Sequence, residues 1–340
     1  MLAVLVVLGL TAALVAGGLV AARAVMSSGA EDYDGAGTGS VTVQIAAGDT
    51  AGDVATTLAA EDVVASREAF FEVARNDPRS TSLQPGFYEV RERMSAVAAL
   101  DLLLDPASRV VGRVTVPEGR TVEQTLETIA EATEIPLEDL RAAARDVGRL
   151  GLPSYAEDQL EGFLFPATYE VQPGTTAVQV LTMMVDRFEQ AAQTTGLEQG
   201  ARELGLSPYE VVIVASLIER EVKRDEEYGQ VARVVYNRLE QDIPLGIDAA
   251  VLYGVGKTAG GEVTASDLAQ DTPYENRRQT GLPPTPIASP GEATLRGALN
   301  PTDGDILYYV LASKDGRTFF TDDYQEFLDQ RDRSRAEGVF

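Results

Sequence analysis

The sequence predicts an α+β protein with an N-terminal transmembrane helix, a small α+β module and a mainly helical C-terminal domain that carries a short β-hairpin. Three observations support this class. Residues 2–22 contain no charged side chain. A short β-type run, a glycine turn and a threonine that begins a helix recur three times along the chain. Apolar residues then repeat with helical spacing over much of residues 176–241.

The N-terminal run is long enough to cross a membrane. A helix of about 20 apolar residues spans the core of a bilayer, so we predict an uncleaved anchor over residues 1–26. A cleaved signal peptide is the alternative, but its apolar region is usually shorter and follows a basic segment, which is missing here. Arg23 follows the run and nothing basic precedes it, which on its own favours a cytoplasmic C-terminal side. Residues 27–40 are rich in Gly, Ser and Asp and are predicted to be a flexible linker.

The recurring unit is a β-type run, a glycine turn and a Thr-x-x-Asp/Gln sequence. A threonine followed three residues later by Gln, or more weakly by Asp, is typical of a capping box at the start of a helix. Units of this kind are common in α/β chains, so three loose matches do not establish duplication. The three predicted helix starts are Thr50 to Asp53, Thr121 to Gln124 and Thr176 to Gln179.

Beyond the linker we expect three segments, namely a module over 41–107, a connecting α/β segment over 108–158 and a C-terminal domain over 159–340. The elements predicted in the module are helices over 51–60, 66–75 and 95–104 and a strand over 86–90. The elements predicted in the C-terminal domain are helices over 176–196, 207–224, 229–241 and 291–299, and hairpin strands over 306–312 and 318–321.

The composition restricts the chemistry. The chain has 340 residues, a formal net charge of −25, no Cys and no His. The negative charge argues against nucleic-acid binding through a basic face. The missing His and Cys exclude Ser-His-Asp and Cys-His arrangements and most zinc sites. Catalysis would depend on carboxylates, Tyr, Lys, Arg, hydroxyls or the backbone, and we predict no metal and no cofactor.

Two carboxylates end the helix predicted over 207–224, in the stretch SLIEREV. On a helical wheel, Glu219 and Glu221 fall on opposite edges of the apolar face, each about 80° from its centre, and Arg220 points to solvent. Partial desolvation at such an edge raises the pKa of a carboxyl group, which suits a general acid. The alternative is that each Glu pairs with a nearby Arg or Lys. Periodicity cannot choose between Glu219 and Glu221.

Two later segments carry further candidates. In VVYNRL, the apolar stripe leaves Asn237 and Arg238 on the remaining surface of a helix. Gly246-Ile247-Asp248 then leads to Tyr253. Residues 272–291, TPYENRRQTGLPPTPIASPG, form a long proline-rich loop that includes Tyr274. Such loops are preorganised and often line sites, although a simple connector is the alternative.

These motifs carry a resemblance. SLIEREV, VVYNRL, the Asp248-to-Tyr253 spacing, TPY and GLPPTPIASPG occur in one order, after LQPGFYEV at 83–90, VTVPEG at 114–119 and LEGFLFPATYEV at 160–171. In order and roughly in spacing, they resemble the YceG-like endolytic murein transglycosylases, the MltG family. The resemblance covers about residues 40–330.

The resemblance implies a lytic transglycosylase that cleaves the MurNAc-β-1,4-GlcNAc bond within nascent peptidoglycan strands. Such an enzyme leaves 1,6-anhydro-MurNAc ends and acts as a terminator of glycan polymerisation. The catalytic residue of the family is the first carboxylate of the Glu-x-Glu pair, which corresponds to Glu219. The substrate-binding residues that we expect are Asn237, Arg238, Asp248, Tyr253 and Tyr274.

The resemblance also implies a single-pass protein of the cytoplasmic (inner) membrane with an extracytoplasmic catalytic domain, which reverses the orientation suggested by Arg23. It makes residues 41–107 a LysM-like module, a type that often contacts glycan. The expected partners are peptidoglycan glycan strands, the cytoplasmic membrane and peptidoglycan synthases, with no nucleic acid. Two residues depart from the family pattern. Gly246 replaces a common Gln and puts one sugar contact in doubt, and Glu275 replaces a common Asn and changes the charge of a loop near the expected substrate site.

A lytic transglycosylase can work with one carboxyl group, which protonates the leaving oxygen and then takes the proton of the sugar's own 6-hydroxyl. A glycoside hydrolase usually needs two carboxylates about 5–10 Å apart. One alternative is therefore a muramidase-type hydrolase that adds Asp248, and another is a non-catalytic anchored scaffold that binds the cell wall. Glu221 is expected to be structural, paired with Arg220, Lys223 or Arg224.

Overall fold

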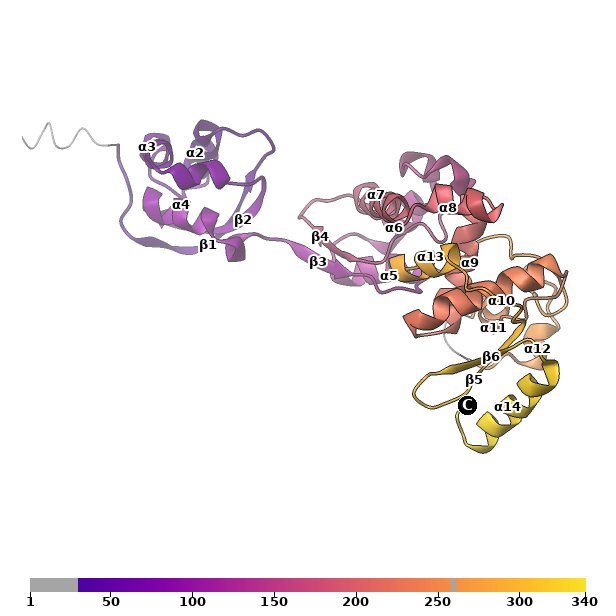
Figure 1. Cartoon of the computed structure of the whole chain (residues 1–340). Coiled ribbons are helices and arrows are strands. Elements are labelled where there is room, and N and C mark those ends of the chain that lie inside the picture. Colours follow the sequence, from indigo (N-terminus) through magenta and orange to yellow (C-terminus); the bar gives the residue numbers. More distant parts are fainter. Residues whose placement is uncertain (1–29, 258–260) are drawn as a thin grey trace, which may run out of the picture. The chain divides into compact units, whose positions relative to one another are not determined.

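The structure is a computed structural model that describes residues 30–257 and 261–340 (Figure 1). The chain divides into two compact units, one that ends at Val111 and one that runs from Gly112 to Phe340, and each is described by itself. The predicted anchor over 1–26 lies outside the described residues. Within the described ranges, no helix has the length and apolar character needed to cross a membrane.

The N-terminal unit is built on a two-stranded antiparallel sheet of β1 (Ala36–Ile45) and β2 (Gly86–Met94). Its helices are α2 (Ala51–Ala60), α3 (Arg67–Asn76) and α4 (Ala96–Leu104), which lie within a residue or two of the prediction. A short η2 (Pro106–Ser108) follows α4. Side chains of the sheet and all three helices share one core, because each helix is apolar on the side that faces the others. Core residues include Leu58, Phe70, Tyr88 and Leu100.

β1 begins inside the predicted linker. Ala36 pairs with Met94, so residues 36–40 belong to a strand and not to a flexible chain. The register shifts between Thr38 and Val41, and this irregularity lets the glycine-rich segment pair with β2. Its composition is that of a loop, which is why the sequence did not indicate a strand here.

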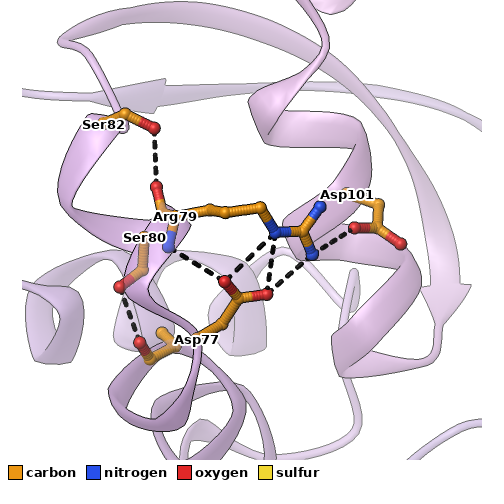
Figure 2. A network of polar contacts seen from close by, with 6 residues as sticks. Asp77, Arg79, Ser80, Ser82 and Asp101 are labelled. Carbon is orange, nitrogen blue, oxygen red and sulfur yellow. Dashed lines mark hydrogen bonds and ion pairs between the residues drawn. The ribbon is translucent and has the colours of Figure 1, made fainter.

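A polar network joins the end of α3 to α4 in the same unit (Figure 2). Asp77 caps η1 (Pro78–Ser82) by accepting the backbone N–H of Arg79 at 2.9 Å. The guanidinium of Arg79 donates to Asp77 at 2.6 Å and to Asp101 on α4 at 2.8 Å. The hydrogen bonds from Arg79 hold the pKa of Asp77 below its usual range. Because Arg79 and Asp101 are exposed, the network orients the turn more than it stabilises the unit.

The first part of the second unit contains an antiparallel pair, β3 (Gly112–Thr115) and β4 (Thr168–Val171). Three helices pack with this sheet around one core, namely α5 (Val122–Ala132), α6 (Leu137–Arg145) and α7 (Ala177–Thr195). Short turns η3 (Val147–Arg149) and η4 (Ser154–Ala156) lie between α6 and β4. The segment predicted as a connection over 108–158 thus shares its core with later residues from Gly112 on, and no boundary between compact units falls at residue 158.

α9 (Pro208–Glu221) is the central helix of the remaining part. All side chains from Val211 to Ile218 are buried, so the prediction of a single apolar face was too narrow. The helices that contact α9 on different sides are α8 (Leu197–Leu204), α10 (Tyr228–Glu240), α11 (Asp248–Gly254) and α13 (Glu292–Leu299). Two short elements complete this part, η5 (Asp225–Glu227) and α12 (Ala265–Leu268).

The C-terminal hairpin is confirmed. β5 (Tyr308–Leu311) and β6 (Thr318–Thr321) pair in antiparallel register. A last helix, α14 (Tyr324–Ala336), packs on both strands and was not predicted. Only Ser334 of this helix is buried, so it has no apolar stripe for periodicity to detect.

The three predicted capping boxes are also confirmed. Thr50, Thr121 and Thr176 each accept the backbone N–H of the residue three positions on, whose side chain bonds back to the threonine backbone. A helix leaves its first N–H groups without intrahelical partners, and these side chains satisfy them locally. The starts of α2, α5 and α7 are therefore encoded in four-residue stretches.

Candidate active site

Glu219 lies in the last turn of α9, where the helix leaves the core. Its Oε2 accepts the backbone N–H of Gly291 at 3.0 Å and the hydroxyl of Thr294 at 2.8 Å. Gly291 is the N-cap of α13 and Thr294 lies in its first turn, where backbone N–H groups lack intrahelical partners. The start of α13 thus fixes one carboxylate oxygen, and in the described part of the chain no donor contacts the other oxygen, Oε1.

The proline-rich segment over 272–291 follows α9 along its length and ends at Glu219. Gly162 allows this close approach, because a Cβ at that position would lie 2.6 Å from the Cβ of Pro286, and its φ is +90°. The segment therefore lines the carboxylate and is more than a connector. Its contacts with α9 run in order: Pro284 O with Tyr209 OH at 3.2 Å, Ile287 N with Ser216 Oγ at 3.1 Å, and Gly291 N with Glu219 Oε2 at 3.0 Å.

The turn between β3 and α5 forms another wall of the site. The N–H of Gly119 donates to Ser289 O at 2.9 Å, and the N–H of Ser289 donates to Arg120 O at 2.8 Å. Gly119 has a φ of +73°, and a Cβ there would lie 3.6 Å from Cγ of Glu219. Burial and the negative charge of Glu219 raise the pKa of the preceding residue, Glu118. In the sequence this turn was noted only as the motif VTVPEG.

Glu221 faces a different side of α9 from Glu219. Its carboxylate accepts the hydroxyl of Tyr309 on β5 at 2.7 Å, and burial raises its pKa. The hydrogen-bond partner of Glu221 is thus a tyrosine, and the positive charge of Arg220 lowers its pKa against the larger effect of burial. Arg220 also donates to Gly119 O at 3.1 Å, and Arg224 pairs with Glu226.

Asn237 and Arg238, at the end of α10, hold backbone segments. Asn237 was expected on the helix surface but is buried, because the chain leading into β5 folds over it. Arg238 also lies over the ring of Tyr308, with 5.4 Å from its guanidinium carbon to the ring centre. Contact of either residue with substrate stays a prediction. The acceptors are Gly304 O and Ile306 O for Asn237 at 3.1 and 2.9 Å, and Leu307 O and Leu245 O for Arg238 at 2.7 Å each.

Asp248 is the first residue of α11 and forms an ion pair with Arg277 of the proline-rich segment. Its negative charge contributes to the raised pKa of Glu221, so it lies on the Glu221 side of α9. No contact of the described residues joins Asp248 to Glu219. In the same ranges, no group of three acidic side chains is placed to hold a metal ion.

Tyr253 and Tyr274 lie together, with ring centres 5.0 Å apart in an edge-on arrangement, and contact of either with substrate stays a prediction. The hydroxyl of Tyr274 is hydrogen-bonded to that of Thr285 at 2.7 Å, which joins two parts of the proline-rich segment that are 11 residues apart. The hydroxyl of Tyr253 donates to Glu161 at 3.1 Å. The two rings thus connect α11, the proline-rich segment and the chain before β4.

Glu161 is an acidic residue that the sequence did not single out. Its carboxylate accepts the N–H of Val122, the first residue of α5, at 3.1 Å, as well as the hydroxyl of Tyr253. Burial raises the pKa of Glu161 to about 7. Its signal in the sequence was an acidic residue inside the otherwise apolar stretch LEGFLFP.

Comparison with known proteins identifies the family of this chain. Residues 43–333 match the YceG-like family. The chain belongs to this family. The match includes all the residues that surround Glu219 in the structure.

YceG-like relatives carry an activity in their names. "Endolytic murein transglycosylase" of Bacillus subtilis (strain 168) is 31% identical over 301 residues, which cover 84% of this chain and 82% of the relative. The protein of the same name from Streptococcus pneumoniae serotype 2 (strain D39 / NCTC 7466) is 29% identical over 328 residues, 88% of this chain. The chain spans only 58% of the length of that relative. The crystal structure of a putative yceG-like protein from Listeria monocytogenes has 26% sequence identity, a TM-score of 0.59, and coverage of 86% of this chain and 99% of that one.

The structure shows the surroundings of Gly246 and Glu275, the two residues that depart from the YceG-like pattern. Gly246 has a φ of +65°, which favours glycine, and its N–H donates to Asn276 O at 2.9 Å. Glu275 is 1% exposed and pairs with Arg278 at 2.7 Å. The carboxylate of Glu275 is thus buried and paired within its own loop, and an effect of its charge on substrate stays a prediction.

Proposed function

We propose that the protein is an endolytic lytic transglycosylase that cleaves the MurNAc-β-1,4-GlcNAc bond of nascent peptidoglycan strands and leaves 1,6-anhydro-MurNAc ends. Cleavage within a growing strand would terminate glycan polymerisation. One observation carries the proposal. Glu219 is the first carboxylate of the Glu-x-Glu motif in a YceG-like chain, and its Oε2 is held by Gly291 and Thr294 while Oε1 has no donor within the described ranges.

In the proposed reaction, Glu219 acts first as the acid and then as the base. The two hydrogen bonds to Oε2 fix the side chain, so Oε1 keeps one orientation without reordering at each turnover. Protonated Glu219 donates its proton to the glycosidic oxygen as the bond between C1 of MurNAc and that oxygen breaks. The carboxylate then takes the proton of the 6-hydroxyl of the same sugar, whose oxygen bonds to C1. Glu219 ends protonated, as it began, and no water is consumed.

The remaining candidates would act around this carboxyl group. Tyr253 and Tyr274 present neighbouring rings, and Asp248 and Arg277 present a charged pair on the exposed side of α11. We propose that these side chains contact sugar. Asn237 and Arg238 would support the site indirectly, because their side-chain N–H groups already donate to backbone carbonyls of the chain before β5.

We further propose that residues 1–26 anchor the protein in the cytoplasmic membrane as a single span, with the catalytic domain over 159–340 outside. The uncharged run at 2–22 supports the anchor. Residues 41–107 would be a LysM-like module that contacts glycan, and their order of strand, two helices and strand is consistent with a small glycan-binding module. Peptidoglycan synthases are the proposed partners, since the substrate is nascent glycan.

Product analysis tests the proposal. The full chain is incubated with uncrosslinked glycan strands, and the new ends are identified by mass spectrometry. Internal 1,6-anhydro-MurNAc ends support the transglycosylase. Reducing MurNAc ends would mean a muramidase-type hydrolase with a second carboxylate such as Asp248, and intact strands would mean a wall-binding scaffold. Either result would overturn the proposal.

A further inference from the structure

Glu118 lies beside Glu219 but comes from the turn between β3 and α5, and the proposed function gives it no role. Both carboxylates meet at Gly291. The N–H of Gly291 donates to Oε2 of Glu219 at 3.0 Å. A Cβ at position 291 would lie 1.9 Å from Oε1 of Glu118. The Glu118 carboxylate thus fills the space that a side chain at position 291 would need.

The turn that carries Glu118 is fixed in this place. Immediately after Glu118, the backbone of Gly119 and Arg120 exchanges two hydrogen bonds with Ser289, at 2.9 and 2.8 Å. Arg220, next to Glu219, donates to the carbonyl of Gly119 at 3.1 Å. The backbone that presents Glu118 is therefore tied both to the proline-rich segment and to α9, and the two carboxyl groups are held near each other.

The surroundings of Glu118 are mostly acidic. Glu219 and Arg220 face it from α9, Asp225 from η5 and the phenol of Tyr228 from α10. Burial, then Glu219, then Asp225 raise the pKa of Glu118. The negative charge of Glu219 therefore opposes the loss of a proton from Glu118.

We propose that Glu118 is a positioning residue for Glu219 and that the two carboxyl groups share one proton. Glu118 holds this proton in the free enzyme and passes it to Glu219 when glycan binds. The inference rests on the proposed function. Glu118 is assigned the proton at rest because Oε2 of Glu219 already accepts two hydrogen bonds. The proton moves from Glu118 to Glu219 and on to the leaving oxygen. The proton of the 6-hydroxyl then restores the pair to one proton.

The pH dependence of glycan cleavage tests this role. In E118Q, Glu219 must take its proton from solvent, so activity should fall more at neutral than at acidic pH. We expect the ratio of turnover at pH 5.5 to turnover at pH 7.5 to rise about threefold or more over that of the native protein. E127Q is the matched control, because Glu127 is an exposed residue of α5, and its ratio should not change. Equal loss at every pH in E118Q, or no loss, would overturn the proposal.

A second readout does not depend on turnover. With ¹³C-labelled glutamate in the full chain, the carboxyl signal of Glu118 is identified by its absence in E118Q. In E219Q this signal should titrate at lower pH than in the native protein, because the neighbouring charge is gone. An unchanged titration would refute the shared proton even if the protein cleaves glycan. If the titration moves but no anhydro ends form, the carboxyl pair stands and the proposed function fails.

Discussion

Replacing Glu219 with Gln separates its chemistry from its structural contacts. The amide oxygen can still accept the bonds of Gly291 and Thr294, but the side chain has no proton to transfer. Losing general acid–base catalysis costs about 10²–10⁴-fold in rate. Hydrogen bonds to a charged group contribute about 1 kcal/mol more than neutral ones, so two of them amount to about 2 kcal/mol. The free energy of unfolding should therefore fall by no more than about 2 kcal/mol.

The matched control is E221Q, two residues further along the same helix. Its carboxylate meets Tyr309 and not the proposed reaction centre, and an amide can accept that hydroxyl too. We expect its rate of anhydro-end formation to stay within a few-fold of the native rate. Initial rates by mass spectrometry and thermal midpoints by circular dichroism are measured for both variants. Near-normal turnover in E219Q with loss in E221Q would show that the wrong carboxylate was assigned, and activity in both would place the catalyst elsewhere.

Three further outcomes are expected. G162A should lower the free energy of unfolding by about 2–4 kcal/mol in denaturant titrations, because the new Cβ clashes with Pro286 and position 162 has a left-handed φ. The control G148A should change the free energy of unfolding little, because a Cβ at position 148 has no atom within 4 Å. Folding raises the pKa of Glu161 from 4.5 to about 7, so the folded state binds this proton more tightly and the free energy of unfolding should fall by up to about 3 kcal/mol as pH rises from 4.5 to 7. E161Q should make the free energy of unfolding depend less on pH over this range. An unchanged pH dependence in E161Q would contradict the burial of Glu161. Removal of residues 1–26 should give a monodisperse protein that still cleaves glycan, as judged by size-exclusion chromatography and product analysis, and aggregation of that variant would count against a separate anchor.

Local features were predictable from the sequence because local contacts determine them. A threonine and the residue three positions on are enough to begin a helix, so the starts of α2, α5 and α7 were predicted from four residues each. The hairpin of β5 and β6 followed from two β-type runs around a turn. The edge positions of Glu219 and Glu221 on α9 followed from helical spacing alone, and the structure gives each carboxylate partners on a different element.

The partners themselves were not predictable. Gly291 and Thr294 are far from Glu219 in the sequence, and nothing in SLIEREV indicates which helix start will meet it. Asn237 was placed at the surface because a helical wheel cannot show that a later loop covers it. The beginning of β1 was read as a linker because pairing with β2 overrides the loop-like composition of residues 36–40.

The contacts of Glu219 also determine when the site can exist during synthesis. Its carboxylate is bonded to residues 72 and 75 positions later in the chain, and its neighbour Arg220 is bonded to a carbonyl 101 positions earlier. Because a chain is made from its N-terminus and such distant contacts form only once both partners are present, α9 can fold before its carboxylate has any fixed orientation. A nascent chain that ends before α13 would therefore carry Glu219 without the contacts that orient its carboxylate, and the proposed site would be complete only after α13 has been made.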